Sequence, residues 1–159
     1  MQLTKAVLER LEIETGSPEE TRRVGERLGR LLKEEDVISL VGELGAGKTT
    51  LIQGIARGLS IKENVTSPSF VLMQEYKGSL PLYHFDLYRI GNEEDIGYED
   101  WLYCHGVSVI EWGEKATEHL PFFHLKIVLS YLSQTRRNLL FVPKGKHFLE
   151  MTKRLIKEI

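Results

Sequence analysis

Apolar residues recur with two different periods in the first part of the chain, and these periods alternate. Residues 7–15 (VLERLEIET) predict a short opening strand, and apolar residues at helical spacing then predict a helix to about Lys33. Residues 36–42 (DVISLVG) form a short apolar run, which is typical of a strand buried on both faces. Residues 48–59 (KTTLIQGIARGL) predict a second helix that ends near Gly58. The apolar positions of the first helix are Val24, Leu28, Leu31 and Leu32.

The start of the first helix carries a capping signal. Ser17 stands at the N-cap, Pro18 at the first helical position, and Glu20 where it closes a capping box. We therefore expect the helix to begin at Pro18.

Strand patterns dominate the rest of the chain, up to a final helix. The segments, in order, are residues 70–78, 80–88, 91–102, 106–112, 122–132, 138–143 and 146–159. The first two are predicted strands joined by a turn at Gly78 and Ser79, the acidic third contains a short helix, and the fifth and sixth form a hairpin. The last is a helix with Phe148, Met151, Leu155 and Ile159 along one side. This order predicts an α/β fold, with a mixed sheet that has a parallel core and antiparallel additions.

Length and composition indicate a single domain with its own core. The chain has 159 residues, of which 42% are hydrophobic, and no linker or repeat divides it. We expect one domain over residues 1–159, with residues 144–159 as a C-terminal helical extension. The formal net charge of -2 gives no overall attraction to nucleic acid. The lone Cys104 and the lack of a signal peptide or membrane span predict a cytoplasmic protein without membrane contact.

A phosphate-binding pattern, G-x-x-x-x-G-K-[ST], follows the strand at residues 36–42. Glycines in such a loop let backbone N–H groups surround phosphate oxygens, the lysine bridges the terminal phosphates, and the hydroxyl binds Mg²⁺. The alternative is a chance glycine-rich turn, but this pattern follows an apolar strand and opens a helix, as the function requires. We therefore predict a P-loop NTPase-like three-layer sandwich. The predicted nucleotide contacts are Gly42, Glu43, Leu44, Gly45, Ala46, Gly47, Lys48, Thr49 and Thr50.

Two carboxylates, Asp86 and Glu111, each end an apolar strand. If both strands run parallel to the strand before the loop, the carboxylates lie at the same edge of the sheet, where magnesium and hydrolysis need them. For either residue the alternative is a surface carboxylate that caps a helix or pairs with Arg89. His84 shares a strand face with Asp86, so it either orients that carboxylate or is simply a packed or solvated histidine.

Residues 66–70 (TSPSF) lie where many P-loop proteins sense the terminal phosphate. The hydroxyl of Thr66 or Ser67 is a candidate contact with metal or phosphate, and Pro68 would stiffen the segment. Judged from spacing alone, an ordinary Ser/Pro turn explains the segment better.

Several classes of P-loop protein are excluded by motifs that the sequence lacks. The D-x-x-G and N-K-x-D motifs of GTPases and the L-S-G-G-Q motif of transporter ATPases do not occur. The arginines after the loop are few and scattered, unlike the arginine-rich lid of most small-molecule kinases. What remains is a compact ATP-binding domain whose turnover serves a partner. A small-molecule kinase and a nucleotide-gated binding module are the alternatives.

Four motifs in a fixed order give the chain a specific resemblance. With GELGAGKTT, TSPSF, YHFDLYR and VIEWGEK, it resembles the bacterial TsaE (YjeE) ATPase family from about Thr15 to Pro121. The resemblance implies an Mg²⁺-dependent ATPase that supports threonylcarbamoyl transfer to the adenosine beside the tRNA anticodon. It also implies TsaD-like and TsaB-like partners, which the protein would bind and reset between catalytic cycles, with tRNA reached mainly through that complex. Because no arginine finger is visible, we expect slow hydrolysis without partners.

The resemblance also implies roles for individual residues. Thr49 and Glu111 would hold Mg²⁺, and Lys48 would hold and polarise the phosphates. Asp86 corresponds to a Walker-B-like aspartate, which would contact the metal or orient water. Thr66 would report the terminal phosphate.

Three further positions have a structural alternative to the role that the resemblance implies. Trp112 would lie near the nucleotide or the partner surface, whereas a tryptophan after a buried strand is more often core. Thr15 and Ser17 would contact the base, whereas Ser17 also serves as a helix cap. An acidic group would face a basic partner or form a solvated surface: Glu93, Glu94, Asp95, Glu99 and Asp100.

Overall fold

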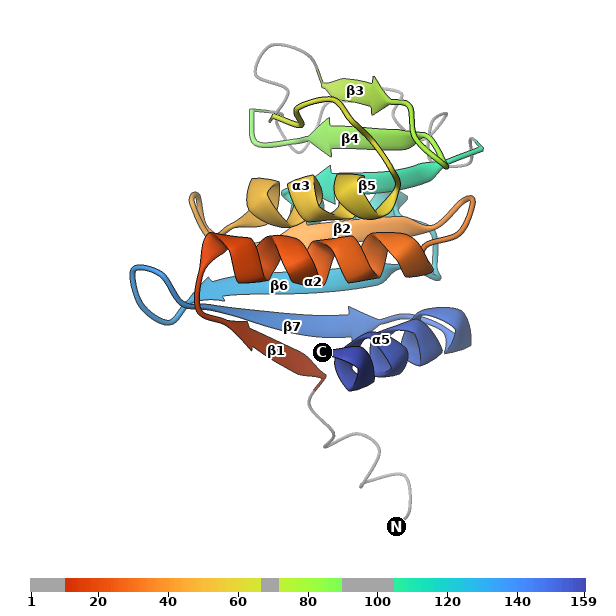
Figure 1. The fold of residues 1–159 in the computed structure, drawn as a ribbon. Coiled ribbons are helices and arrows are strands. Elements are labelled where there is room, and N and C mark those ends of the chain that lie inside the picture. The colour runs from red at the N-terminus through yellow and green to blue at the C-terminus, as the bar shows by residue number, and fades with distance from the viewer. Residues whose placement is uncertain (1–10, 67–71, 90–104) are drawn as a thin grey trace.

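A seven-stranded mixed sheet with the strand order β1-β7-β6-β2-β5-β4-β3 forms the centre of the protein (Figure 1). The computed structural model describes residues 11–66, 72–89 and 105–159. Its elements are β1 (Glu12–Thr15), α2 (Pro18–Leu31), β2 (Val37–Val41), α3 (Lys48–Gly58), β3 (Met73–Tyr76), β4 (Leu82–Asp86), β5 (Val107–Glu111), η1 (Gly113–His119), β6 (Leu125–Tyr131), β7 (Arg137–Pro143) and α5 (Lys146–Glu158). The predicted α/β class is confirmed.

Parallel pairing places the carboxyl ends of the central strands together. Strand β2 pairs in parallel with β5 on one side and β6 on the other, and β4 pairs in parallel with β5. The antiparallel additions are β7 beside β6, β1 beside β7, and β3 beside β4. The loop that follows β2 and the residues that end β4 and β5 therefore share one edge of the sheet.

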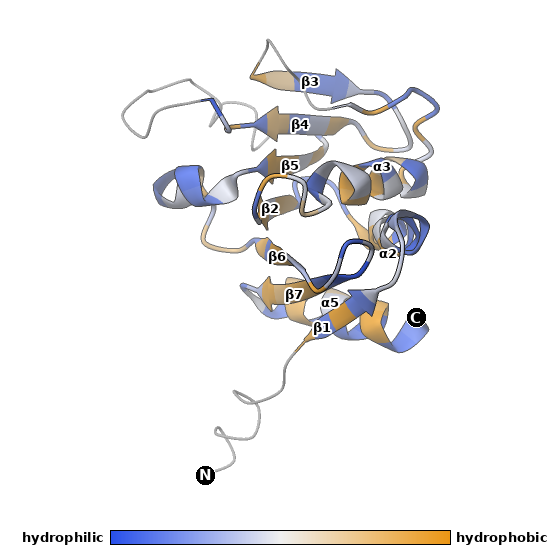
Figure 2. Ribbon diagram, turned by 90° about the vertical axis from the view of Figure 1, so that its left-hand side faces the viewer, coloured by the Kyte–Doolittle hydropathy of each residue, from blue (hydrophilic) through white to orange (hydrophobic). Residues whose placement is uncertain are grey.

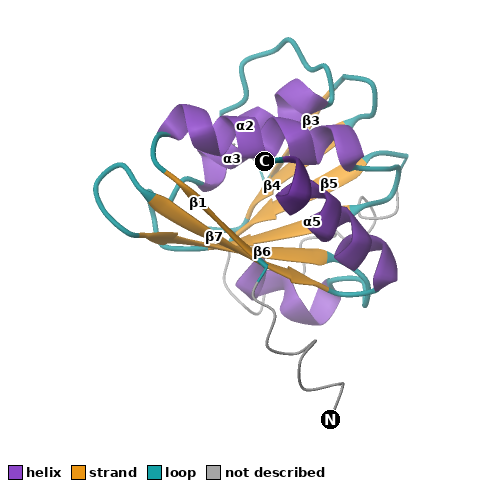
Figure 3. Cartoon of the chain, turned by 60° about the horizontal axis from the view of Figure 1, so that its bottom comes forward, coloured by secondary structure: helices purple, strands orange, loops and turns teal. Residues whose placement is uncertain are grey.

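The two faces of the sheet carry separate hydrophobic clusters. Helices α2, α3 and α5 lie together on one face (Figure 3), and the 3₁₀ segment η1 contributes to the cluster on the other. The larger cluster includes Ile38, Leu40, Leu51, Ile55, Leu82, Val109, Phe141 and Leu155. The smaller one comprises Val37, Tyr83, Phe85, Leu87, Ile110 and Ala116. Alternate residues of β2 and β5 thus enter opposite clusters, which explains why these strands read as continuous apolar runs and colour as hydrophobic in Figure 2.

Helix α2 begins as its capping signal predicts. The Ser17 Oγ accepts a hydrogen bond of 3.2 Å from the Glu20 N–H. In a standard capping box the Glu20 carboxylate would accept from the N–H of the N-cap residue, Ser17. Here it accepts from the Gly16 N–H, one residue earlier. The helix ends at Leu31, two residues earlier than predicted, where the Asp36 carboxylate accepts the Lys33 N–H at 2.8 Å.

Helices α2 and α3 pack with their backbones in contact. A Cβ atom on Gly25 would collide with the Leu51 carbonyl, and one on Gly54 would collide with the Arg22 carbonyl. Gly29 and Gly58 are equally close to the opposite backbone. A side chain at any of these positions would push the two helices apart.

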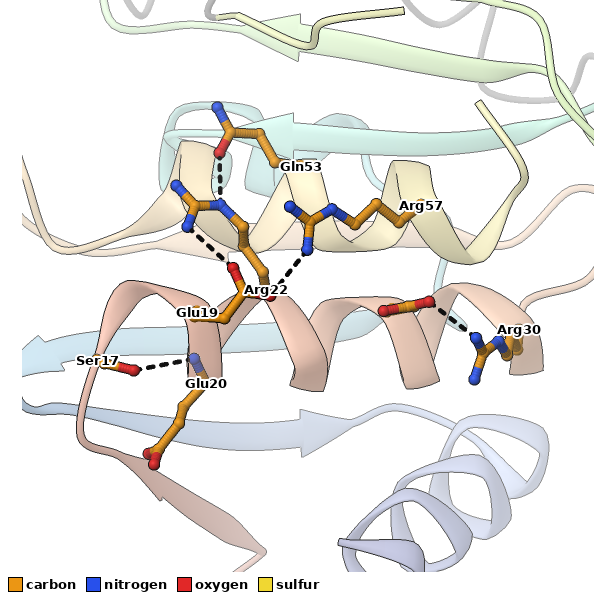
Figure 4. A network of polar contacts seen from close by, with 8 residues as sticks. Ser17, Glu19, Glu20, Arg22, Arg30, Gln53 and Arg57 are labelled. Atoms are coloured by element: carbon orange, nitrogen blue, oxygen red, sulfur yellow. Dashed lines mark hydrogen bonds and ion pairs between the residues drawn. The ribbon is translucent and has the colours of Figure 1, made fainter. Parts of the chain in front are cut away.

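Polar contacts border this helix pair on its exposed side (Figure 4). Glu19 lies between Arg22, at 3.4 Å, and Arg57, at 3.0 Å. Arg22 also donates to the Gln53 side chain, whose amide in turn donates to the Val65 carbonyl at 3.1 Å. Because exposed ion pairs contribute little, these contacts add little to the stability of the α2–α3 interface.

The final helix, α5, is part of the core. Phe148, Met151 and Leu155 are buried, as their spacing predicts, whereas the prediction for Ile159 is wrong: it follows the helix and is 55% exposed. His147 fixes the start of the helix, because its Nε2 lies 2.9 Å from the Asp36 Oδ1. The helix covers the β7 side of the sheet next to α2, so residues 146–158 complete the layer that α2 and α3 begin.

Some sequence predictions fall outside the described residues. These are residues 91–102 with their acidic group, Cys104, and the Ser67 and Pro68 positions of the TSPSF segment. Within the described ranges, no helix has the length and apolar character needed to cross a membrane.

We expect Gly54→Ala to lower the free energy of unfolding by at least about 2 kcal/mol, measured by urea denaturation. Alanine is the better helix former by about 1 kcal/mol, but its Cβ would overlap the Arg22 carbonyl. Arg57→Ala on the same helix is the control, because it removes only an exposed ion pair and should cost no more than about 1 kcal/mol. Equal stability of Gly54→Ala and the unmutated protein would contradict the close-contact explanation.

We expect Leu155→Ala to cost about 2–5 kcal/mol in the same measurement, because its side chain is fully buried in the main core. Ile159→Ala should change stability by less than about 0.5 kcal/mol, because that residue is exposed. If both variants were neutral, α5 would be an appendage without a part in the core.

Candidate functional site

The loop between β2 and α3 has the backbone conformation that its glycines permit. Gly45 and Gly47 have φ angles of 79° and 103°, in the left-handed region that residues with a Cβ rarely adopt. The Ala46 N–H donates to the Glu43 carbonyl at 3.0 Å, which closes the turn. Helix α3 then begins at Lys48, so its N-terminal, positive end points into the loop.

Lys48 is held inside this loop. Its side chain is buried, and its Nζ donates to the Gly42 carbonyl and, at 3.1 Å, to the Glu43 carbonyl. Burial lowers the pKa of the Lys48 ammonium, while the carboxylates of Glu111, Glu114 and Asp86 act in the opposite direction. The ammonium therefore lies at the sheet edge, in the field of the carboxylates that end β4 and β5.

Trp112 forms one wall of the lysine site. The Lys48 Nζ is 3.9 Å from the centroid of the indole ring, within range of a cation–π contact. The backbone of Trp112 has a φ of 60°, which is uncommon for a bulky residue and costs on the order of 1–3 kcal/mol. The ring of Tyr88 lies 5.0 Å away and supports the indole. The left-handed backbone directly after β5 thus places this side chain against Lys48.

Thr49 and Glu111 meet across the gap between α3 and β5. The Thr49 Oγ1 donates to the Glu111 Oε1 at 3.1 Å, and the His84 Nε2 lies 2.6 Å from the other carboxylate oxygen. Glu111 is only 3% exposed. The hydrogen bond of His84 is thus with Glu111, whereas His84 acts on Asp86 only through its charge among the described residues.

Asp86 lies directly beside Glu111, since the two residues are register partners in the parallel β4–β5 pair. Its Oδ1 accepts the Tyr88 N–H at 3.0 Å. Burial raises the pKa of the Asp86 carboxyl; the Tyr88 N–H lowers it, and the neighbouring Glu111 carboxylate raises it further. Both strand-end carboxylates lie at the edge predicted from the sequence.

The oxygen atoms gathered here suit Mg²⁺. A hydroxyl and one or two carboxylates are the protein ligands that this ion takes when phosphate and water supply the others. No group of three or more histidine, cysteine, aspartate and glutamate side chains arranged to hold a metal occurs among residues 11–66, 72–89 and 105–159. Among the described residues, Thr49, Asp86 and Glu111 would suit an ion that takes its other ligands from phosphate and water.

A small pocket opens beside the loop, on the side of α2 and the β6–β7 turn. It is lined by Pro18, Thr21, Gly45, Gly47, Thr50, Gln134, Thr135 and Arg137. The guanidinium carbon of Arg137 lies 4.3 Å from the Tyr131 ring centroid, and the Tyr131 hydroxyl donates to the Leu44 carbonyl at 3.1 Å. The β6–β7 turn is thereby attached to the phosphate loop.

The pocket contains residues that sequence reasoning missed. Gln134, Thr135 and Arg137 belong to a polar turn that carries no motif, and they reach the loop only because β6 pairs with β2. The predicted contact segment around Thr15 and Ser17 is close to the pocket, but different residues of it form the wall. To predict this pocket from the sequence, one would need to know which strands are neighbours in the sheet, and the pattern of apolar residues does not specify that.

The remaining predicted residues are placed as follows. Thr15 is buried, and its hydroxyl lies 2.7 Å from that of Thr21; Ser17 is occupied as the cap of α2. Thr66 is exposed, and its carbonyl accepts from the Tyr76 hydroxyl at 3.4 Å. Leu44 is 68% exposed at the tip of the loop. The structure thus gathers Lys48, Thr49, Asp86, Glu111 and Trp112 in one place and does not bring Thr15 into the pocket.

Comparisons with known proteins agree with this architecture. A protein named tRNA threonylcarbamoyladenosine biosynthesis protein TsaE from Treponema pallidum is 44% identical over 126 residues, which cover 77% of this chain and 93% of that protein. The protein of the same name from Bacillus subtilis is 38% identical over 143 residues, covering 89% and 90% of the two chains. The crystal structure of Bacillus subtilis YdiB superimposes with a TM-score of 0.83 at 34% identity, over 94% of this chain and 96% of that one.

The family model described as "Threonylcarbamoyl adenosine biosynthesis protein TsaE" matches residues 15–139. That range contains the phosphate loop, both strand-end carboxylates and every residue that lines the pocket. On this match and on the relatives above, the chain belongs to the TsaE family.

Proposed function

We propose that this protein is an ATP hydrolase that uses Mg²⁺ and supports the formation of threonylcarbamoyladenosine on tRNA. The observation that carries the proposal is the meeting of Lys48, Thr49 and Glu111 at one edge of the sheet, where the phosphate loop opens a helix. The tRNA product follows from the description of the family and from the names of its members.

Each side chain has a distinct part in this proposal. The loop N–H groups and the N-terminus of α3 bind the phosphates, and Lys48 exchanges its loop carbonyl partners for phosphate oxygens. Thr49 and Glu111 would hold Mg²⁺, which neutralises charge on the phosphates when bound. Asp86, with its pKa raised, is placed to orient the attacking water through a hydrogen bond.

The nucleoside end of ATP fits the pocket between α2 and the β6–β7 turn. This pocket includes Gly45 and Gly47 of the phosphate loop, so a ligand held by the loop extends into it directly. Arg137, already stacked on Tyr131, offers a planar cation to a base, and Gln134 and Thr135 offer hydrogen-bonding groups.

Turnover is proposed to serve a complex with TsaB-like and TsaD-like proteins, with tRNA bound mainly by that complex. The chain itself has a formal net charge of -2, which gives it no general attraction to RNA. A phosphate-transferring kinase needs a separate acceptor site, whereas the pocket at Gly45 and Gly47 is continuous with the phosphate loop and holds the nucleotide itself in this proposal. A nucleotide-gated module that never hydrolyses ATP remains the alternative that experiment must separate.

We expect Lys48→Ala to lower the rate of ATP turnover by about a hundredfold or more, because the cation that contacts the transferred phosphate is lost. Phosphate release would be measured with and without the TsaB-like and TsaD-like proteins, together with threonylcarbamoyl incorporation into tRNA over repeated cycles. Lys62→Ala, which removes an exposed lysine outside the loop, is the control and should leave both readouts unchanged.

Three outcomes would contradict parts of the proposal. Transfer of phosphate to a metabolite in place of water would indicate a kinase. Full tRNA modification by Lys48→Ala without ATP turnover would indicate a gated binding module. Modification that ignores the unmutated protein through repeated cycles would refute the role in the complex.

We expect Arg137→Ala to weaken ATP binding by about tenfold and to leave the binding of inorganic tripolyphosphate unchanged, because the lost contact is with the base. Arg136→Ala is a matched control, since the neighbouring arginine pairs with Glu14 and does not line the pocket. Equal losses for ATP and tripolyphosphate would show that Arg137 acts on the phosphates and that the base lies elsewhere.

A further inference from the structure

His84 is a buried polar side chain in a strand whose neighbouring side chains are apolar. It is fully buried, as are Leu82 and Phe85 in the same strand. Its Nε2 lies 2.6 Å from the Glu111 Oε2, while its Nδ1 is buried without a partner among the described residues. A residue that served packing alone would be apolar here, because an imidazole with one unpartnered nitrogen costs free energy in a core. The hydrogen bond to Glu111 therefore explains why a histidine, and not an apolar residue, occupies this position.

Strand register explains how the contact arises. His84 pairs with Val109, and Asp86 pairs with Glu111, so His84 lies one diagonal step from Glu111. Side chains two residues apart point to the same face of a strand, which here is the face covered by α3. The imidazole therefore approaches Glu111 from within the core, and Thr49 approaches it from the helix.

The two contacts occupy different oxygens of one carboxylate. Oε2 faces the His84 ring at 2.6 Å, and Oε1 accepts from Thr49 at 3.1 Å. An ionised carboxylate can only accept, so the tautomer that makes this hydrogen bond with ionised Glu111 carries its hydrogen on the His84 Nε2. The last torsion of a glutamate is broad, and a donor on one oxygen restricts it. The oxygen that faces Thr49, and with it the phosphate loop, is thereby fixed in direction.

The carboxylate needs this restraint because Asp86 lies directly beside it in the strand register. Neighbouring like charges repel, and the repulsion favours rotation of one group away from the other. A donor behind Glu111 opposes such a rotation and keeps both carboxylates at the edge of the sheet. The arrangement matches the general finding that groups hydrogen-bonded to a metal ligand orient it.

We propose that His84 is a positioning residue, which holds the Glu111 carboxylate so that its Oε1 is directed toward the metal held with Thr49. The inference rests on the proposed function, because it assumes that Glu111 and Thr49 hold a divalent cation beside bound nucleotide. It assigns His84 to Glu111, and leaves Asp86 to be held by the Tyr88 N–H.

The test measures Mn²⁺ binding to the full-length chain in the presence of ADP by electron paramagnetic resonance. His84→Leu removes the donor and keeps an apolar side chain; it should weaken Mn²⁺ binding by about tenfold. Binding of fluorescent ADP in EDTA should stay within about twofold of the unmutated protein. His84→Gln places an amide N–H near the position of Nε2 and should recover most of the affinity, whereas the shorter His84→Asn should not.

Phe85→Leu is the matched control for damage to the strand. Phe85 is equally buried in β4 but belongs to the cluster on the opposite face. Its Mn²⁺ affinity should equal that of the unmutated protein. Were His84→Leu not to fold, the comparison between the Gln and Asn variants decides: Gln near the unmutated value with Asn weakened supports the proposal, and equal affinities overturn it.

The outcomes separate this inference from the proposed function. If the unmutated protein binds Mn²⁺ with ADP and Glu111→Gln weakens that binding while His84→Leu does not, the inference is wrong and the proposed function stands. If Phe85→Leu loses as much as His84→Leu, the effect is one of packing and the inference is wrong. If the unmutated protein binds no Mn²⁺ with ADP, the proposed metal site fails, and the inference fails with it.

Discussion

The site depends on the parallel register of β2, β5 and β4. Glu111 pairs with Leu40 near the end of β2 and with Asp86 at the end of β4. Three chain segments far apart in sequence therefore finish at one level of the sheet, and a loop that follows β2 meets carboxylates from its neighbours. An antiparallel β4 or β5 would send its carboxylate to the opposite edge, and the phosphate loop would stand without its acidic partners.

Gathering these groups creates an electrostatic conflict that the surroundings moderate. Two carboxylates lie side by side at a buried edge, where burial raises the pKa of Asp86 and lowers that of Lys48. Burial disfavours both the ammonium of Lys48 and the carboxylate of Asp86, whereas each of these charges stabilises the other. Backbone carbonyls and an indole face are the other partners of Lys48, and the N–H of Tyr88, in the turn after β4, is a partner of Asp86. The left-handed Trp112 is one place where the fold departs from a relaxed conformation, as is common at functional sites.

How far the sequence predicts this structure depends on whether a feature is local. The glycine–lysine loop, the cap at Ser17 and the apolar run of β2 are local, and the structure contains each of them. The prediction that Asp86 and Glu111 share one edge of the sheet required their strands to be parallel, and the structure shows that β4 and β5 are parallel. The partner of His84 and the pocket wall at Arg137 were beyond sequence reasoning, because both depend on which strands are neighbours. The prediction for Ile159 was wrong for a simpler reason. The apolar spacing in the sequence continues to Ile159, but the helix ends at Glu158.

The glycine contacts between α2 and α3 have a mechanical consequence. Pro18 and Thr21 of the pocket stand at the start of one helix, and the phosphate loop leads into the other. Gly25 and Gly54 bring the two helix backbones into direct contact, without side chains between them. Sliding of one helix along the other would make these backbones collide. The α2 residues of the pocket wall and the phosphate loop are thus held in a fixed position relative to each other. A movement that admits or releases a ligand therefore has to come from parts of the site other than the contact between α2 and α3.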